Sequence, residues 1–349
     1  MQRDEFEPPQ HPDAQPVKAV PVWRWVAISV LMVALTAAAI FVPIPIVFLY
    51  LPGPVRNVEE LVKVSDGRVY SSEGALYMTT VSVDTDVSFV ELIIAAISPD
   101  QRVVMKEDVT GGQSLEQLQT EQQAEMENSQ ANARQVAFSE LGLDHPTGDG
   151  AKVVTTITGA PADGVLEPDD VIVAVDGEPI ETTCDVGRAI DGHDTGDEIT
   201  VTVTRDGRER DFDLKLVPNP IDGSPGFIGV QMRTVHFQFD PGVTVDFETG
   251  QIAGPSAGLM LSLALYDLLT PEDLTAGHQI AGTGTLECDG GVGPIGGIQQ
   301  KVAGARAEGA EIFLAPLANV EEARAVAHGI KIVPIGTFDD AVEYLGGLE

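Results

Sequence analysis

Residues 26–51 form an apolar run without a charged side chain, and this run limits what the N-terminal part of the chain can become. A helix rises ~1.5 Å per residue and the hydrocarbon core of a bilayer is ~30 Å thick, so about 20 such residues can span it. The only tryptophans, Trp23 and Trp25, precede the run, where an interfacial aromatic belt would lie. A core helix seldom runs so long without a charge, and a signal peptide has a shorter apolar stretch. The run therefore predicts an uncleaved membrane anchor over residues 23–51.

The charge balance of the chain restricts its partners. Of its 349 residues, 54 are acidic and 20 are basic, which gives a formal net charge of −34. Binding a polyanion needs a basic surface that releases counterions, so we expect no nucleic-acid partner. Hydrophobic residues make up 43% of the chain, which is enough to bury cores. Residues 1–22 are polar and rich in proline, and they predict a disordered tail.

Residues 52–143 alternate extended and helical character, and we expect a mixed α/β connector there. Ser88 and Glu91 stand before the apolar residues 92–97, in a capping-box pattern that satisfies the first free amides of a helix. Residues 114–141 are rich in Gln and Glu with few Gly or Pro, which predicts a long, mostly solvated helix with a sparse apolar stripe. This region shows no catalytic grouping, and we interpret it as a connector or an assembly element.

Residues 144–218 form a predicted unit of short strands, with hairpin signals at Asp176-Gly177 and Asp206-Gly207. The stretch 159–180 within it resembles PDZ domains of bacterial proteases. By this resemblance the loop Gly148–Ala151 would face the carboxylate of a peptide C-terminus, since loop amides and a sheet edge can add a peptide strand. The alternative is a PDZ unit that binds no peptide and only packs on its neighbour.

Two stretches in the last region, residues 219–349, carry the chemistry. In the first, Ala253-Gly-Pro-Ser-Ala-Gly258, Pro255 suits a first helical turn, so Ser256 lies at or beside a helix start. A helix start carries unpaired amides and a partial positive charge, which would stabilise an oxyanion formed at Ser256. Alone this motif is weak, because serine is common at helix caps.

The second stretch runs from Thr283 to Lys301, and its dense glycines deliver one lysine to the start of a helix. It is no phosphate loop, because the Gly-x4-Gly-Lys-Ser/Thr order is absent there and elsewhere in the chain. An ATPase module of about 200 residues would also find no room beside the other domains. We therefore expect no dependence on ATP and no cofactor.

Together the two stretches resemble the proteolytic domain of Lon proteases. In that family a Gly-Pro-Ser-Ala-Gly motif holds the nucleophile, and a Thr-Gly…Gly-x-Val-x-Pro-Ile-Gly-Gly-x-x-x-Lys segment holds a partner lysine. The resemblance implies that Ser256 is the nucleophile, Lys301 its base and Thr283 a hydrogen-bonding support. Asn319 matches a further Pro-x-x-Asn pattern of the family. Ala253 stands where many members carry an acidic residue.

A serine–lysine pair follows a simple acid–base logic. Serine is a weak nucleophile until a base removes its proton. Lysine, with a reference pKa of about 10.4, is protonated at neutral pH, but burial lowers that pKa by several units. A neutral amine can then act as the general base and later protonate the leaving amine. A pair of Ser256 with His278 is the alternative, although no carboxylate stands at a spacing that would orient the histidine.

Cys184 and Cys288 are the only cysteines, which excludes a disulfide-stapled scaffold and a cysteine-rich metal site. A single disulfide between them is possible. Free cysteine is often buried, however, so two small buried residues are the interpretation we favour.

The fold class we expect is multidomain: an N-terminal transmembrane helix, a mixed α/β connector, a small β-rich PDZ domain and an α/β (α+β) Lon-type proteolytic domain. The predicted function is an ATP-independent, membrane-anchored serine endopeptidase with PDZ-mediated recognition or gating of protein or peptide substrates. The alternative is a PDZ-containing membrane scaffold or chaperone with an inactive Lon-like domain.

Resemblance to exported Lon-like proteins also implies a location and an assembly. It implies a single-pass protein of a bacterial cytoplasmic membrane, with both folded domains outside the cytoplasm, and a ring-shaped homo-oligomer. The basic residues that flank the apolar run are too even in number to decide its orientation.

Overall fold

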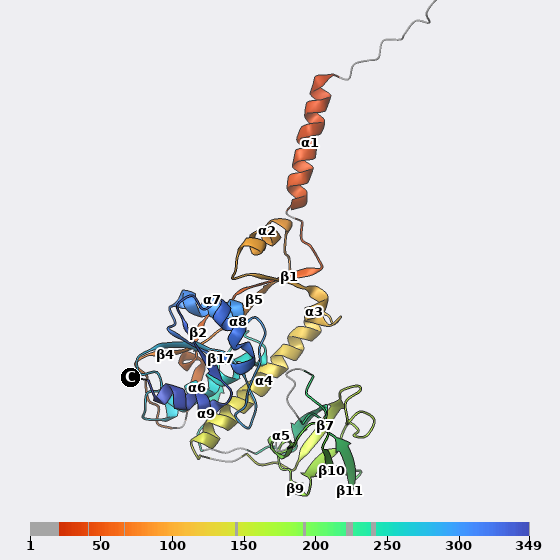
Figure 1. Ribbon diagram of the computed structural model, residues 1–349, viewed down its shortest axis with the longest axis vertical. Coiled ribbons are helices and arrows are strands. Elements are labelled where there is room, and N and C mark those ends of the chain that lie inside the picture. The colour runs from red at the N-terminus through yellow and green to blue at the C-terminus, as the bar shows by residue number, and fades with distance from the viewer. Residues whose placement is uncertain are drawn as a thin grey trace, which may run out of the picture.

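The first helix, α1 (Val22–Ile40), projects away from the folded body of the protein (Figure 1). The computed structural model describes residues 21–40, 42–65, 67–143, 146–190, 193–220, 226–238 and 242–348. Most of the expected tail at residues 1–22 therefore lies outside the described residues. Within the described ranges, no helix is both long enough and apolar enough to cross a membrane. The prediction of a transmembrane anchor at residues 23–51 is wrong.

The apolar run divides because its second half belongs to a sheet. α1 ends at Ile40, and β1 (Val47–Pro52) lies at the centre of an antiparallel sheet in the order β5-β1-β6. Val47, Phe48 and Leu49 are buried, so they are apolar because they form a core. Apolar character alone does not separate a buried strand from a helical span. The other elements here are β5 (Val81–Asp84), α2 (Phe89–Ile97), β6 (Arg102–Met105) and α3 (Lys106–Thr110).

The central sheet has five strands in the order β18-β17-β14-β4-β2. Neighbouring strands from β18 to β4 are parallel, and β2 at the edge is antiparallel. Because alternate residues point to opposite faces, Ile280 faces a core shared with α4, α6 and α9, and Ala281 faces a core shared with α7 and α8. The strands are β2 (Arg56–Asn57), β4 (Ala75–Met78), β14 (Gln279–Gly282), β17 (Ile312–Pro316) and β18 (Lys331–Ile335). The helices are α6 (Gly258–Leu269), α7 (Ile298–Glu308), α8 (Val320–Ala325) and α9 (Phe338–Gly346).

Helix α4 (Leu115–Glu140) packs into this central unit instead of standing in solvent. A capping box of Ser88 and Glu91 starts α2, as predicted. A second capping box, formed by Ser114 and Gln117, starts α4. The C-terminal half of α4 packs against α6, so the expected solvated helix is found only in the N-terminal half. Several of the buried side chains are small, which lets the two helices approach closely. The buried residues are Met126, Ser129, Ala133, Gln135, Val136, Ala137 and Phe138.

The unit of short strands is inserted into the central unit. Its sheet has the order β11-β10-β8-β7-β12, with β9 beside β8, and α5 (Thr183–Ile190) packs against it. β12 (Val230–Thr234) follows the linker and pairs antiparallel with β7, so this unit continues beyond residue 218. The chain then returns to the central unit through β13 (Val245–Phe247), which pairs with β3 (Val62–Val64). The remaining strands are β7 (Ala151–Thr156), β8 (Val171–Val175), β9 (Glu178–Pro179), β10 (Glu198–Arg205) and β11 (Arg208–Lys215).

Candidate active site

Ser256 lies in a 3₁₀ turn, η2 (Pro255–Ala257), that leads directly into α6. Gly254 before it has a φ of +90°, a conformation that favours glycine. A side chain at Gly258 would collide with β15 (Thr285–Leu286), because an added Cβ would lie 2.8 Å from the Cβ of Leu286. The Gly-Pro-Ser-Ala-Gly motif therefore encodes a tight turn pressed against β15, with Ser256 between two required glycines.

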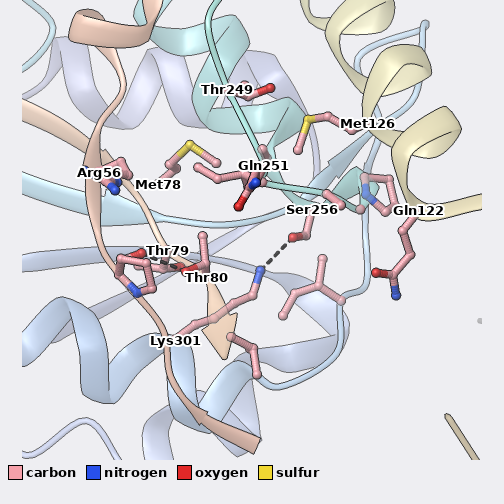
Figure 2. A pocket seen from close by; sticks show the side chains of 18 of the residues that line it. Arg56, Met78, Thr79, Thr80, Gln122, Met126, Thr249, Gln251, Ser256 and Lys301 are labelled. Carbon is pink, nitrogen blue, oxygen red and sulfur yellow. Dashed lines mark hydrogen bonds between the residues drawn. The ribbon is translucent and has the colours of Figure 1, made fainter. Parts of the chain in front are cut away.

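Lys301 reaches Ser256 from the first turn of α7 (Figure 2). Its Nζ donates hydrogen bonds to Ser256 Oγ at 2.7 Å and to Thr283 Oγ1 at 2.8 Å. The Thr283 hydroxyl donates in turn to the backbone carbonyl of Ser256 at 3.0 Å. The structure thus brings together the three residues that the sequence proposes for the site, and their catalytic roles remain a prediction.

The amine of Lys301 belongs to an almost fully buried side chain. Lys301 is only 4% exposed, and this burial lowers its pKa from 10.5 to about 7. Among the described residues, no carboxylate forms an ion pair with it. Ala253, at the position where a family acid was expected, adds no charge. Burial therefore favours the neutral amine, which is the form that a general base requires.

The glycine-dense turn before α7 is shaped by close contacts. An added Cβ at Gly297, which has a φ of +69°, would lie 2.7 Å from a methyl group of Val81. The side-chain amide of Asn319 holds the turn from the other side. Its Oδ1 accepts from the amide of Ile295 at 2.9 Å, and its Nδ2 donates to the Ile295 carbonyl at 3.0 Å. Asn319 therefore positions the start of the helix that carries Lys301.

Helix α4 holds the serine turn in place, which sequence reasoning missed. The amide of Gly254 donates to the carbonyl of Gln122 at 2.9 Å, and the Ser129 hydroxyl donates to the carbonyl of Pro255 at 2.9 Å. Asn132 Nδ2 donates to the carbonyl of Leu286 in β15 at 2.8 Å. Ser129 and Asn132 lie three residues apart and so share one helix face. This polar stripe on an otherwise apolar helical face is the signal that could have revealed them.

A cavity of about 930 Å³ opens beside the serine and the lysine. Met78 and Met126 give it an apolar wall, as Figure 2 shows. Three carboxylates also line it, from Glu60, Glu125 and Glu248. The cavity is large enough for several residues of an extended peptide.

Comparison with known families gives this geometry a context. Residues 117–216 match the family model of the PDZ domain. Residues 233–345 match that of the Lon protease (S16) C-terminal proteolytic domain. The chain pairs a PDZ-like domain with a Lon-like proteolytic domain. Both predicted resemblances are confirmed.

The curated relatives match about a third of this chain or less. Lon protease 2 of Bacillus subtilis is 27% identical over 109 residues, which cover 31% of this chain and 18% of that protein. The Lon protease of Campylobacter concisus is 35% identical over 95 residues, which cover 26% of this chain and 12% of that protein. The matched region thus spans less than a fifth of either relative. Among solved structures, the PDZ domain of an SdrC-like protein from Listeria monocytogenes matches 25% of this chain and 90% of that chain, with 27% identity and a TM-score of 0.23.

Two backbone amides of the predicted carboxylate-binding loop of the PDZ-like domain already donate hydrogen bonds within the domain. The amide of Asp149 donates to the carbonyl of Val235 at 2.8 Å, and the amide of Gly150 donates to that of Glu181 at 3.0 Å. Strand β12 also covers the edge of β7. The prediction that the loop Gly148–Ala151 faces a peptide C-terminus is therefore wrong. The order of strands along the sheet, which brings β12 back onto β7, was not visible in the sequence.

The predicted alternative base also lies elsewhere. His278 precedes β14, and its Nδ1 lies 2.6 Å from a carboxylate oxygen of Glu311. His278 is not among the residues that line the cavity beside Ser256. The Ser256–His278 pair therefore has no geometric support.

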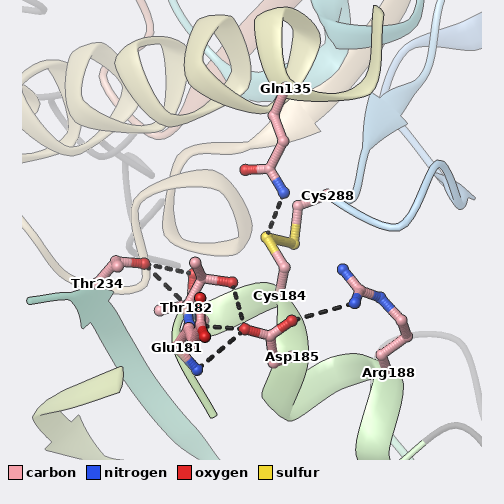
Figure 3. A network of polar contacts seen from close by, with 9 residues as sticks. Gln135, Glu181, Thr182, Cys184, Asp185, Arg188, Thr234 and Cys288 are labelled. Atoms are coloured by element: carbon pink, nitrogen blue, oxygen red, sulfur yellow. Dashed lines mark hydrogen bonds and ion pairs between the residues drawn. A yellow bond between two sulfur atoms is a disulfide. The ribbon is translucent and has the colours of Figure 1, made fainter. Parts of the chain in front are cut away.

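The two cysteines form a disulfide that joins the PDZ-like domain to the Lon-like domain (Figure 3). Cys184 lies in the first turn of α5, and Cys288 follows β15. Gln135 of α4 donates to the Sγ of Cys184 at 2.9 Å. The interpretation of two unlinked buried cysteines is wrong, because the insertion of one domain into the other brings residues 104 positions apart together.

Proposed function

We propose that this protein is a serine endopeptidase in which Ser256 is the nucleophile and Lys301 is the general base. The observation that carries the proposal is the 2.7 Å contact between Ser256 Oγ and the amine of a buried lysine with a pKa of about 7. Ser256 Oγ attacks the scissile carbonyl carbon while its proton passes to the lone pair of Lys301 Nζ. The C–N bond then breaks, and the lysine returns the proton to the leaving nitrogen. Water hydrolyses the acyl-enzyme by the same proton path.

The reaction as proposed needs no ATP. Hydrolysis of a peptide bond is accomplished by the serine and the lysine, and the sequence carries no phosphate-loop order. Activity of the purified full chain on casein, in the absence of any nucleotide, tests this statement.

A set of point variants tests the proposed pair in the full chain. Ser256→Ala and Lys301→Met should each abolish casein cleavage, whereas His278→Ala should leave it unchanged. Identical background rates in the wild type and Ser256→Ala would favour the scaffold or chaperone alternative. Loss of activity in His278→Ala alone would restore histidine as the base.

We also propose that the PDZ-like domain recruits peptides along β12 and α5. β12 is the last strand of its sheet, so its outer edge can accept an added strand. Thr183 at the start of α5 bonds to Thr234 of β12, and Ile190 at its end lies against Gly226. Gly187 shares their helix face, and an added Cβ there would meet nothing within 4 Å. The face of α5 between these contacts thus offers room for a peptide side chain.

Filling that room tests the recruitment. Gly187→Trp should weaken binding of peptide C-termini to the Ser256→Ala protein and slow casein cleavage, while cleavage of short peptides stays unchanged. Gly346→Trp, at an exposed position of α9 where an added Cβ also meets nothing within 4 Å, is the matched control. Equal effects of Gly187→Trp on casein and on short peptides would exclude recruitment by this face.

We further propose that the folded domains work in an oxidising compartment outside the cytoplasm. The disulfide between Cys184 and Cys288 supports this location, because such bonds persist where glutathione does not reduce them. Alkylation of cells before lysis should leave both thiols unlabelled. Complete labelling would place the protein in a reducing compartment.

A further inference from the structure

Three cavities adjoin along α4, and one side chain lines all of them. The dyad cavity of about 930 Å³ is flanked by one of about 380 Å³ between α3 and α4. A third, of about 590 Å³, extends from Pro255 to Asn219 near the end of the PDZ-like domain. Pro255 and Thr285 line the first and the third, and Glu125 lines all three. We call these three cavities, which share lining residues beside the serine, the α4 groove.

Glu125 lies in the α4 groove without a cationic partner. In the described part of the chain, no lysine, arginine or histidine forms an ion pair with it. Glu125 is half-buried, and this burial, with the negative charge of Glu121 nearby, raises its pKa. A carboxylate that has lost part of its water is stabilised strongly by a cation that donates hydrogen bonds to it.

The other charges in the groove favour a cation as well. Glu60 and Glu248 line the dyad cavity, and Asp108 and Glu121 line the second cavity. Apart from Lys301 of the dyad, Arg56 is the basic residue recorded in the lining of these cavities. The acidic residues therefore make the electrostatic potential along the groove negative, in keeping with the net charge of −34 of the whole chain.

We propose that the α4 groove binds the substrate as an extended peptide, and that Glu125 selects a lysine or arginine at one position near the scissile bond. The proposal rests on the proposed protease function of Ser256 and Lys301. It adds a substrate class, which is peptide segments that carry a basic residue, and a specificity residue on a helix outside the Lon-like match. Acidic segments would be rejected by the same charges.

Fluorogenic peptides test the proposal in the full chain at low ionic strength. A parent peptide is made with Lys, Gln or Glu at each position on either side of the cleaved bond in turn. At one position, kcat/KM for the Lys peptide should exceed that for the Glu peptide roughly tenfold, a usual size for one charge-assisted hydrogen bond. Glu125→Gln should reduce this preference to about twofold, and Glu125→Lys should reverse it. Glu127→Gln is the control, since Glu127 is exposed and lines none of the three cavities.

The outcomes separate this inference from the proposed function. Cleavage of all peptides at equal rates, or an equal preference in Glu125→Gln and Glu127→Gln, overturns the role of Glu125 while the protease function stands. Cleavage that survives in Ser256→Ala overturns the proposed function itself. The reversal by Glu125→Lys would not follow from a structural defect, and melting temperatures of all variants check that each is folded.

Discussion

Replacing Lys301 by methionine should make the protein more stable and inactive at the same time. Burial lowers the pKa of Lys301 from 10.5 to about 7, and at about 1.4 kcal/mol per pH unit this costs the folded state about 5 kcal/mol at neutral pH. The hydrogen bonds to Ser256 and Thr283 offset about 1 kcal/mol each. Methionine has a similar volume and no charge to desolvate. We therefore expect Lys301→Met to raise the free energy of unfolding by about 3 kcal/mol at pH 7.

The gain should depend on pH in a defined direction. Between about pH 7 and 10.5, the unfolded lysine binds more protons than the folded one. The free energy of unfolding of the wild type therefore rises with pH across this window, and methionine lacks this rise. The stability gain of Lys301→Met should be largest at or below about pH 7. Near pH 10.5 only the two hydrogen bonds of the lysine still count, so Lys301→Met should there be less stable than the wild type by about 2 kcal/mol.

Urea unfolding of both proteins at pH 7 and pH 10 measures this difference. Circular dichroism is the suitable signal, because Trp23 and Trp25 both lie in α1 and do not report on the domain that holds Lys301. Ser256→Ala, which leaves the amine in place, is the control for loss of activity alone. A Lys301→Met protein that is less stable than the wild type at pH 7, or equally stable at all pH values, would refute the description of the lysine as a desolvated amine.

Other predictions use the same site. kcat/KM should increase as pH rises through about 7, because only the neutral form of Lys301 accepts the Ser256 proton, and a flat profile between pH 6 and 8 would contradict this. Asn319→Ala removes both hydrogen bonds to the turn before α7 and should lower kcat/KM roughly 10- to 100-fold through misplacement of Lys301. Gln123→Ala, at an exposed position of α4 that lines none of the three cavities, should not lower it. Cys288→Ser should lower the stability by up to about 5 kcal/mol, the loop-entropy value for a bridge of about 100 residues, measured by urea unfolding without reductant.

The local part of the site was predictable from the sequence. Ser256 and Lys301 stand in short glycine-containing motifs. The positive φ of Gly254 and the close contact at Gly258 both favour glycine, so a few adjacent residues determine the turn. The capping box at Ser88 is likewise a local pattern. Each of these features depends on neighbours within a few residues.

The long-range part was not predictable. Strand β4 joins the central sheet through pairing with β14, about 200 positions away, and no periodicity in a single strand indicates its partner. The hydrogen bond between α4 and the Gly254 amide, and the pairing of β12 with β7, likewise join residues that are far apart in the sequence. The apolar run misled for a related reason: Val47 to Leu49 are apolar because a sheet and helix bury them.

The insertion determines how the two domains influence each other. The PDZ-like domain is joined to the Lon-like domain by the chain after α4, by the chain after β12 and by the Cys184–Cys288 bridge. A domain held at three points does not swing away freely, so these links can carry an effect of bound peptide to Ser256. Two of the links end on elements of the site. A carbonyl of α4 accepts a hydrogen bond from the Gly254 amide. Cys288 follows β15, whose Thr285 lines the dyad cavity. Reduction of the bridge would remove the route through β15 and leave the route through α4 intact.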